Sequence, residues 1–381
     1  MVRVLRTRPI NLWRAALTLL GAGLRRAPLV GPRVVQLNIA DRCNLRCIMC
    51  NQSCFPPGGF LDPDRAISLT DELAALGLQE LFWHGYGEPC LHPHLGDMIA
   101  TVGRRHPALR QFTVSNGTCI SETLVGILRD RDVGVRISAH AGDRETWARI
   151  HPQNDPGLFD RMVEAIACLA KGRPGRIELL FALFKTNRDQ IDSMIRLARK
   201  TGVRRILFRP MRLFRGASGA WMNDHLMPGR EDFLHLREQL LTLREELRGE
   251  MELSLDAFAM SGFDSSLGRP VTGDYFLRHP CLIGWVFSVV ETDGRVHGCL
   301  PESSTGPMGN IHQQSFREIW WSDAYRSFRR DRVTCGRAGG NPEACHTWCQ
   351  HLDTNMRLND LLSLRIGPRR RRAPAAADGQ W

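Results

Sequence analysis

Short apolar runs alternate with longer amphipathic segments over the first two thirds of this chain. Each run is rich in Val, Ile, Leu and Phe, which is typical of buried strands, and the segments between them carry apolar positions at helical spacing. Several of those segments begin at Ser or Asp and end at Gly, as helices do. Alternation of this kind predicts a parallel sheet with crossover helices. The six candidate strands are residues 34–40, 78–85, 109–116, 132–139, 176–183 and 204–211.

The pattern divides the chain into four segments. A helical pattern over residues 230–249 ends the repeating part, and after residue 254 the chain turns to short segments, Gly-rich turns and five cysteines. We therefore expect two structural units with a further segment at each end. They are an N-terminal amphipathic helical segment at 1–32, a core at 33–254, a small Cys-rich extension of β-hairpin and helix at 255–355, and a basic tail at 356–381.

The N-terminal segment "INLWRAALTLLGAGLRR" has the apolar content of a helix but not the length of a membrane span. Arg14 interrupts the run, and no small-residue cleavage site follows it cleanly. A span needs about 20 apolar residues. We expect an amphipathic helix packed under the main domain, and peripheral attachment to a membrane surface is the alternative.

Composition adds limits on partners and compartment. The chain of 381 residues is 43% hydrophobic and 24% charged, which is ordinary for a folded globular protein. Its net charge of +11 is compatible with acidic partners and equally with solvated Arg-rich faces. Nothing outside the βα repeat resembles an RNA-binding module, so no nucleic-acid partner is expected. Twelve cysteines without a credible export signal favour a reducing compartment, so we expect a cytoplasmic protein.

Three cysteines stand directly after the first candidate strand, in "DRCNLRCIMC". Cys43, Cys47 and Cys50 form a C-x3-C-x2-C array. Three thiolates can hold three irons of a [4Fe-4S] cluster and leave the fourth iron open to a substrate or cofactor. The alternative is a structural zinc site completed by Cys54, but the array lacks the paired C-x2-C knuckles usual in zinc ribbons.

In the loop after the first strand of a βα repeat, this array resembles that of the radical S-adenosylmethionine superfamily. The resemblance implies an α/β fold, a partial (β/α)6 TIM-type barrel with its chemistry at the carboxyl ends of the strands. After the second strand, "HGYGEP" is similar to that family's glycine-glycine-glutamate motif. Gly85, Gly87 and Glu88 would then present backbone carbonyls to the methionine amino group of the cofactor.

Two further strand ends fit the same family. "SNGT" places Ser115 and Asn116 where a polar side chain reaches the ribose or the methionyl portion of the cofactor. "ISAHAGDRETWARIHP" is similar to the family's segment after the fourth strand, with Ser138 at the ribose-contacting position. Met49 stands where an aromatic residue is common before the last cluster cysteine, and it would keep an apolar shelf for the adenine.

The sequence also departs from the family pattern. His140 and Ala141 replace the usual Asp-Gly, and His151 occupies the place where many relatives carry an Arg near the cofactor carboxylate. Under the resemblance, that role falls to Arg149 or to Arg209.

The extension carries a second set of cysteines. Cys281 and Cys299 flank two apolar runs joined by a Thr-Asp-Gly turn, which predicts a hairpin that brings the two thiols together. The order is similar to the SPASM or shorter twitch extension of radical S-adenosylmethionine enzymes, which binds auxiliary [4Fe-4S] clusters. Only five of the seven cysteines of the full pattern are present. We expect one auxiliary cluster on Cys281, Cys299, Cys345 and Cys349, with Cys335 as a substitute ligand and zinc as the alternative metal.

The resemblance implies a mechanism. S-adenosylmethionine chelates the open iron, the reduced cluster passes one electron into the sulfonium, and the resulting 5'-deoxyadenosyl radical abstracts a hydrogen atom from the substrate. A one-electron donor such as flavodoxin or ferredoxin must reduce the cluster. Cys54, Cys90 or Cys119 could return a hydrogen atom in an epimerisation, whereas Cys168 lies in a helical pattern and is expected in the core.

Three functions are open at this point. The first is oxidative modification of a peptide or protein, as in most relatives with such an extension. The second is oxidation or epimerisation of a carbohydrate or aminocyclitol, which the shortened extension favours. The third, a metal-dependent binding protein without catalysis, is disfavoured by the ordered cofactor motifs. A leader peptide would need a separate docking protein, because no recognition domain of about 80 residues precedes the core.

Overall fold

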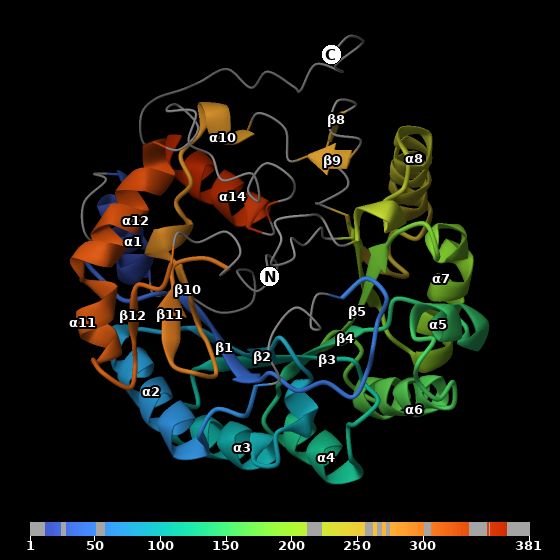
Figure 1. The fold of residues 1–381 in the computed structure, drawn as a ribbon, viewed down its shortest axis with the longest axis horizontal. Helices are drawn as coiled ribbons and strands as arrows, with labels where there is room; N and C mark the ends of the chain where they lie inside the picture. Colours follow the sequence, from blue (N-terminus) through green and yellow to red (C-terminus); the bar gives the residue numbers. More distant parts are fainter. Residues whose placement is uncertain are drawn as a thin grey trace.

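The computed structural model contains one large sheet wrapped by helices. Within the described residues, its ten strands have the order β12-β11-β10-β1-β2-β3-β4-β5-β6-β7, and they form an open, curved wall with the helices outside it (Figure 1). The described residues are 12–23, 28–50, 58–211, 223–255, 262–264, 269–271, 275–300, 306–334, 349 and 351–363.

All six strands expected in the core are present and parallel. A seventh strand, β7, pairs with β6 in the same direction. It was not predicted, because a strand of three residues is too short to show a recognisable pattern of apolar positions. The parallel strands are β1 (Val34–Ala40), β2 (Glu80–Gly85), β3 (Arg110–Ser115), β4 (Gly134–Ser138), β5 (Ile177–Leu183), β6 (Arg205–Pro210) and β7 (Glu252–Ser254).

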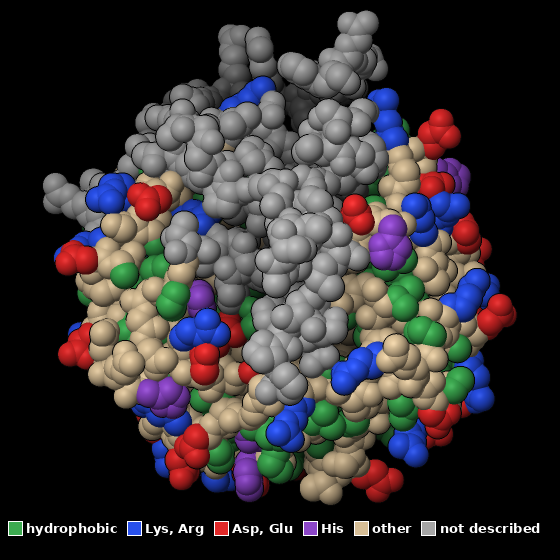
Figure 2. Space-filling view, viewed as in Figure 1, with side chains coloured by type: hydrophobic (Ala, Val, Ile, Leu, Met, Phe, Trp, Pro, Cys, Tyr) green, Lys and Arg blue, Asp and Glu red, His purple; other side chains and the backbone are tan. Residues whose placement is uncertain are grey.

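Helices follow the strands and cover the outer face of the sheet (Figure 1). On the visible face their Lys and Arg side chains are interspersed with Asp and Glu (Figure 2). These helices are α2 (Pro63–Leu76), α3 (Leu95–Arg105), α4 (Glu122–Asp130), α5 (Arg144–Ile150), α6 (Leu158–Ala170), α7 (Ile191–Thr201) and α8 (Arg230–Glu246). Single 3-10 turns occur at η3 (Pro89–Leu91), η4 (Arg188–Gln190), η5 (Asp224–Leu226) and η6 (Ile283–Trp285).

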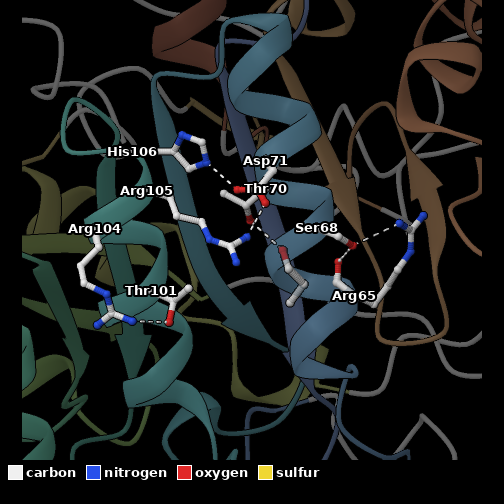
Figure 3. Close-up of polar contacts among 9 residues, drawn as sticks. Arg65, Ser68, Thr70, Asp71, Thr101, Arg104, Arg105 and His106 are labelled. Carbon is white, nitrogen blue, oxygen red and sulfur yellow. Dashed lines mark hydrogen bonds and ion pairs between the residues drawn. The ribbon is translucent and has the colours of Figure 1, made fainter.

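Helix α2 shows how local sequence sets an element. The side chain of Asp62 accepts a hydrogen bond from the backbone N–H of Arg65 and caps the first turn. Gly77 ends the helix with φ of 101°, a left-handed conformation that favours glycine. Asp71 on the same helix accepts from Arg105 and His106 at the end of α3, at 2.5 and 2.6 Å (Figure 3). These partly exposed contacts align two neighbouring helices.

The core lies between the sheet and its helices. On β1, Val35, Leu37 and Ile39 are fully buried. Burying such a side chain contributes about 1.5–3 kcal/mol relative to exposure. Alternate residues of the strand point to the opposite face. There Gln36 and Asn38 make that inner face polar.

The Cys-rich extension continues the barrel sheet. Strand β10 pairs in parallel with β1, and β11 and β12 follow as antiparallel neighbours. The strands of the extension and of the core therefore form one sheet, although the sequence predicted two units with a boundary near residue 255. The remaining elements are β8 (Gly262–Asp264), β9 (Arg269–Val271), α10 (Tyr275–Arg278), β10 (Phe287–Val290), β11 (Arg295–His297), β12 (Gly309–Asn310), α11 (Phe316–Trp320), α12 (Asp323–Thr334) and α14 (Leu352–Ser363).

The N-terminal helix packs against this extension, whereas we expected it under the main domain. Helix α1 (Leu12–Gly23) contacts α14 and η6. The indole N–H of Trp320 donates to the carbonyl of Val30 at 3.0 Å, and that of Trp321 donates to Pro28 at 2.7 Å. Across the described ranges, every helix is too short or too polar to cross a membrane. The basic tail beyond residue 363 lies outside the described residues.

Candidate active site

The cysteine array lies in the loop that leaves the carboxyl end of β1. The backbone N–H of Ile48 donates to the carbonyl of Ile150 at 3.0 Å, and that of Arg46 donates to the side chain of Asn154 at 2.8 Å. These bonds tie the loop to the segment after α5. Cys50 closes a tight turn on Cys47, with its N–H 3.1 Å from the carbonyl oxygen.

The three thiols of the array influence one another. Cys43 and Cys47 are partly buried and Cys50 is exposed. Burial, with a smaller contribution from neighbouring thiols, raises the pKa of Cys43 to about 11 and the pKa of Cys47 well above its usual range. A bound metal reverses this preference, because it stabilises thiolates. In the described part of the chain no group of three His, Cys, Asp or Glu side chains forms a preformed metal cage. The fit to a cluster therefore rests on the donor chemistry of three neighbouring thiols.

The loop after β2 lies directly on the cysteine loop. The N–H of Gly87 donates to the carbonyl of Ala40 at 3.0 Å, and the N–H of Glu88 donates to the carbonyl of Arg42 at 2.7 Å. A Cβ at Gly85 would lie 2.1 Å from the carbonyl oxygen of Ala40, and a Cβ at Gly87 would lie 2.0 Å from that of Arg42. Glycine is required at both positions because two backbones meet there.

The carboxylate of Glu88 joins the second and third loops. Its side chain is only 2% exposed. One oxygen accepts from the N–H of Cys90 at 2.9 Å and the other from the N–H of Asn116 at 2.6 Å. Burial raises the pKa of this carboxyl, and the two backbone donors oppose that effect. Sequence reasoning assigned Glu88 only a backbone carbonyl and missed this role of its side chain.

The loop after β3 reaches the first cysteine. The amide of Asn116 donates to Asn44 at 2.9 Å and lies 3.9 Å from the sulfur of Cys43. The hydroxyl of Ser115 accepts from the N–H of Gly117 at 2.9 Å and so shapes the turn. Three predicted site segments therefore meet at the carboxyl ends of β1, β2 and β3.

Two other predicted residues stand apart from those contacts. Ser138 ends β4 and is partly buried. Arg149 is exposed on α5, where its guanidinium donates to the hydroxyl of Thr146 at 3.1 Å. The described structure gives Arg149 no contact with the three joined loops.

Two buried histidines and an arginine lie beyond β4. Burial, together with the nearby Arg209 and His151, lowers the pKa of His140 to about 3. Burial also lowers the pKa of His151 to about 4, and its ring stacks on Trp147 with centroids 4.1 Å apart. Both rings are therefore neutral at pH 7, and neither supplies the positive charge that a carboxylate would need. The guanidinium of Arg209 on β6 lies close enough to His140 to act on the pKa of its ring.

A line of polar side chains on the inner face was not anticipated. The amide of Gln36 donates to Asn38 at 3.0 Å and lies 3.4 Å from His84, and the amide of Asn38 donates to Glu291 at 3.3 Å. Glu291 is 4% exposed, and its second oxygen has no partner in the described part of the chain. Burial raises the pKa of this carboxyl to about 7. The polar residues within the apolar run "VVQLNIA" were the available signal.

Three of the expected auxiliary cysteines are described. Cys281, Cys299 and Cys349 are all partly buried. Burial is the main cause of the raised pKa of Tyr275, and the charges of Cys281 and Cys349 raise it further. The two thiols therefore lie near the same phenol. Cys299 acts in the same way on the pKa of Tyr325. The predicted ligand Cys345, its substitute Cys335 and the loop residue Cys54 lie outside the described residues.

The two cysteine sets lie toward opposite ends of the sheet. Cys281 precedes β10, and Cys299 follows β11 two residues after His297, which pairs with Val289. Because β10 runs parallel to β1, both lie toward the amino end of β1, whereas the array follows its carboxyl end. The six residue steps of β1 span about 20 Å.

The remaining cysteines differ in exposure. The thiol of Cys90 lies 3.4 Å from the hydroxyl of Ser115, and that of Cys119 lies 3.7 Å from the hydroxyl of Thr118. Cys168 is exposed on α6, so its expected place in the core was wrong. The helical pattern located its helix but not the side of the helix on which it lies.

Comparison with known proteins agrees with this arrangement. The family model for the radical SAM superfamily matches residues 37–205, and that for the SPASM iron-sulfur cluster-binding domain matches residues 281–350. The AdoMet-dependent heme synthase of Methanosarcina barkeri is 27% identical over 326 residues, covering 81% of this chain and 88% of that protein. A GTP 3',8-cyclase of Klebsiella pneumoniae is 27% identical over 54% of this chain and 62% of its own length.

Solved structures share the fold. SuiB of Streptococcus suis bound to S-adenosylmethionine has a TM-score of 0.64 at 13% identity, covering 86% of this chain and 75% of its own. The enzyme anSMEcpe with bound AdoMet has a TM-score of 0.59 at 16% identity, covering 88% and 98%. The array after β1, the joined loops and the matched models lead to one conclusion: the chain belongs to the radical SAM superfamily and carries a SPASM iron-sulfur cluster-binding domain.

Proposed function

We propose that this radical SAM enzyme abstracts a hydrogen atom from a peptide or protein substrate and oxidises it by two electrons. The observation that carries the proposal is the pairing of β1 with β10, which attaches a second cysteine set to the strand that bears the first. An enzyme that only isomerised its substrate would need no electron acceptor, whereas a two-electron oxidation needs one for the electron that the substrate radical loses.

In this proposal Cys43, Cys47 and Cys50 hold the [4Fe-4S] cluster that binds S-adenosylmethionine. When bound, the pair supplies a carbon radical that removes an unactivated hydrogen. The chain's own part is to fix the loop, through the backbone bonds at Gly87 and Glu88. The amide of Asn116 beside Cys43 adds a hydrogen-bond donor toward a cluster sulfur.

The cofactor's other groups have candidate partners among the predicted residues. Gly85, Gly87 and Glu88 would present carbonyls to the methionine amino group, and Ser138 would contact the ribose. For the cofactor carboxylate we favour Arg209 over Arg149, because Arg149 is exposed and bonded within its own helix.

The auxiliary cluster would be held by Cys281, Cys299, Cys345 and Cys349, with Cys335 as a substitute ligand. When bound it supplies a one-electron acceptor. Because its described cysteines lie toward the amino end of β1, we expect this cluster to be separated from the array by roughly the length of that strand, about 20 Å. The electron would therefore leave the substrate through the barrel and not at its mouth.

A peptide substrate is supported by the structural likeness to SuiB bound to its precursor peptide SuiA, with a TM-score of 0.64 over 91% of this chain at 13% identity. A flavodoxin or ferredoxin would supply the first electron in the cytoplasm. A second candidate, a carbohydrate or aminocyclitol, is favoured by the polar line formed by Gln36, Asn38, His84 and Glu291 on the inner face.

The experiment follows deuterium. Reduced, reconstituted enzyme is incubated with peptides encoded beside its gene and, separately, with deuterated carbohydrates and aminocyclitols. The peptide proposal predicts that 5'-deoxyadenosine forms faster than in buffer alone and that the peptide loses two hydrogens. Stimulation and deuterium transfer from a carbohydrate alone would replace the first candidate with the second.

The role of the second cysteine set is tested separately. Cys281→Ala and Cys299→Ala should preserve cleavage of S-adenosylmethionine while the oxidised product is lost. Unchanged product would remove this set from the electron path. Loss of product in Cys90→Ala or Cys119→Ala alone, with solvent deuterium entering the substrate carbon, would show epimerisation instead.

A further inference from the structure

Helix α12 contacts the segments that carry Cys281 and Cys299, and it buries an arginine. Arg329 is 2% exposed and is packed between two aromatic rings. The carbon of its guanidinium lies 4.4 Å from the ring centre of Trp320 and 4.4 Å from that of Tyr325. A cation between aromatic faces is held tightly in place.

Backbone carbonyls satisfy only part of the guanidinium. Its Nε donates to the carbonyl of Gly284 at 2.8 Å, and one terminal nitrogen donates to the carbonyl of Trp320 at 2.9 Å. The other terminal nitrogen of Arg329 is buried and has no partner among the residues that the structure describes. An arginine has five N–H donors, so this one has unused donors inside the protein.

No carboxylate within the described ranges forms an ion pair with Arg329. Burial lowers the pKa of this guanidinium to about 10, so it remains protonated at pH 7. A buried charge is costly unless an opposite charge compensates it. The arginine therefore points to an anionic group close by.

The neighbours of Arg329 are the segments that carry the auxiliary cysteines. Gly284, to which it donates, lies three residues after Cys281. Phe328, the preceding residue of α12, packs on Gly298 beside Cys299, where a Cβ would lie 2.4 Å from the phenyl ring. The same helix accepts the N–H of Cys281 through the carbonyl of Arg332 at 3.4 Å. Helix α12 thus contacts the backbone at Cys281 and beside Cys299.

We propose that Arg329 is the counter-charge of the auxiliary iron-sulfur cluster and raises its reduction potential. A [4Fe-4S] cluster with four thiolates is negatively charged and gains one more negative charge on reduction. A fixed cation nearby stabilises the reduced form more than the oxidised form. The residue acts through the field of its charge and is a positioning residue, not a catalytic one.

The test compares variants by redox titration, with the reduced cluster followed by electron paramagnetic resonance. It is done on the reconstituted full chain and again with Cys43, Cys47 and Cys50 all changed to Ala, so that the auxiliary signal is read alone. Arg329→Met should lower the equilibrium constant for reduction by tenfold or more, about 59 mV for a one-electron couple. Arg330→Met is the matched control, because Arg330 is exposed on the same helix. The reduction potential of the auxiliary cluster in this variant should equal that of the wild type.

Arg329→Lys separates charge from structure. Lysine keeps the cation and loses the planar fork, so it should keep most of the potential that Met loses. A Met variant with full iron content and a wild-type potential would overturn the proposal. If the Met variant fails to bind iron, the Lys variant decides: recovery of iron and potential supports the charge, and failure of Lys as well shows that the fork alone matters and overturns it.

Discussion

Gly87→Ala should break the contact between the two loops that form the cofactor site. The new Cβ would lie 2.0 Å from the carbonyl oxygen of Arg42. Ordinary contacts are near 3.5 Å, so one backbone must move by about 1.5 Å. That movement breaks the bonds from Gly87 to Ala40 and from Glu88 to Arg42. At about 1 kcal/mol for each bond and about 1–3 kcal/mol of strain, we expect a loss of about 3–5 kcal/mol.

The measurement is urea unfolding of iron-free protein followed by circular dichroism, which keeps cluster loss out of the transition. Gly126→Ala is the control, because nothing lies within 4 Å of its new Cβ on α4. Removing that helical glycine should stabilise the protein by about 0.5–1 kcal/mol. Gly87→Ala should also lose S-adenosylmethionine cleavage after reconstitution. A stability within about 0.5 kcal/mol of wild type, with normal cleavage, would show that the two loops do not depend on this contact.

Three other outcomes are expected. Glu88→Gln leaves one buried N–H without its acceptor, at a cost of about 1–3 kcal/mol, and should raise the KM for S-adenosylmethionine; an unchanged unfolding midpoint and KM would count against the carboxylate bridge. Because the pKa of His140 falls from 6.5 to about 3 on folding, the unfolded state binds the proton first, and stability is lost as pH falls through that window. The slope is about 1.4 kcal/mol per pH unit. His140→Asn, which tolerates the observed φ of 57°, should flatten the slope seen in urea midpoints, and an unchanged slope would contradict the assignment. Reconstituted protein should hold about eight irons, and about four once Cys43, Cys47 and Cys50 are Ala; zinc in their place would overturn the cluster assignment.

Local patterns predicted the core well because its elements are local. The strand that becomes β1 is a largely apolar run in which every residue but Gln36 is buried, and the array that follows it is a short motif. The close approach at Gly85 and Gly87 was not predicted, because the sequence singled out these glycines only through a family motif and the fold brings the second backbone to them.

The missing parts depend on contacts between distant segments. The pairing of β1 with β10 joins residues about 250 positions apart, and apolar periodicity does not register such a pair. The bond between Asn38 and Glu291 has the same origin. The periodicity of a helix is also too coarse to predict whether one given side chain is buried. For this reason Cys168 was assigned to the core, although it is exposed.

We expect the loop after β1 to bind the cluster that cleaves S-adenosylmethionine. The most direct measurement is the amount of 5'-deoxyadenosine formed when the anaerobically reconstituted protein is reduced with dithionite in the presence of S-adenosylmethionine, for wild type and Cys47→Ala. We expect slow formation of 5'-deoxyadenosine by the wild type even without substrate and none by the variant. Cleavage that survives the substitution would contradict this expectation.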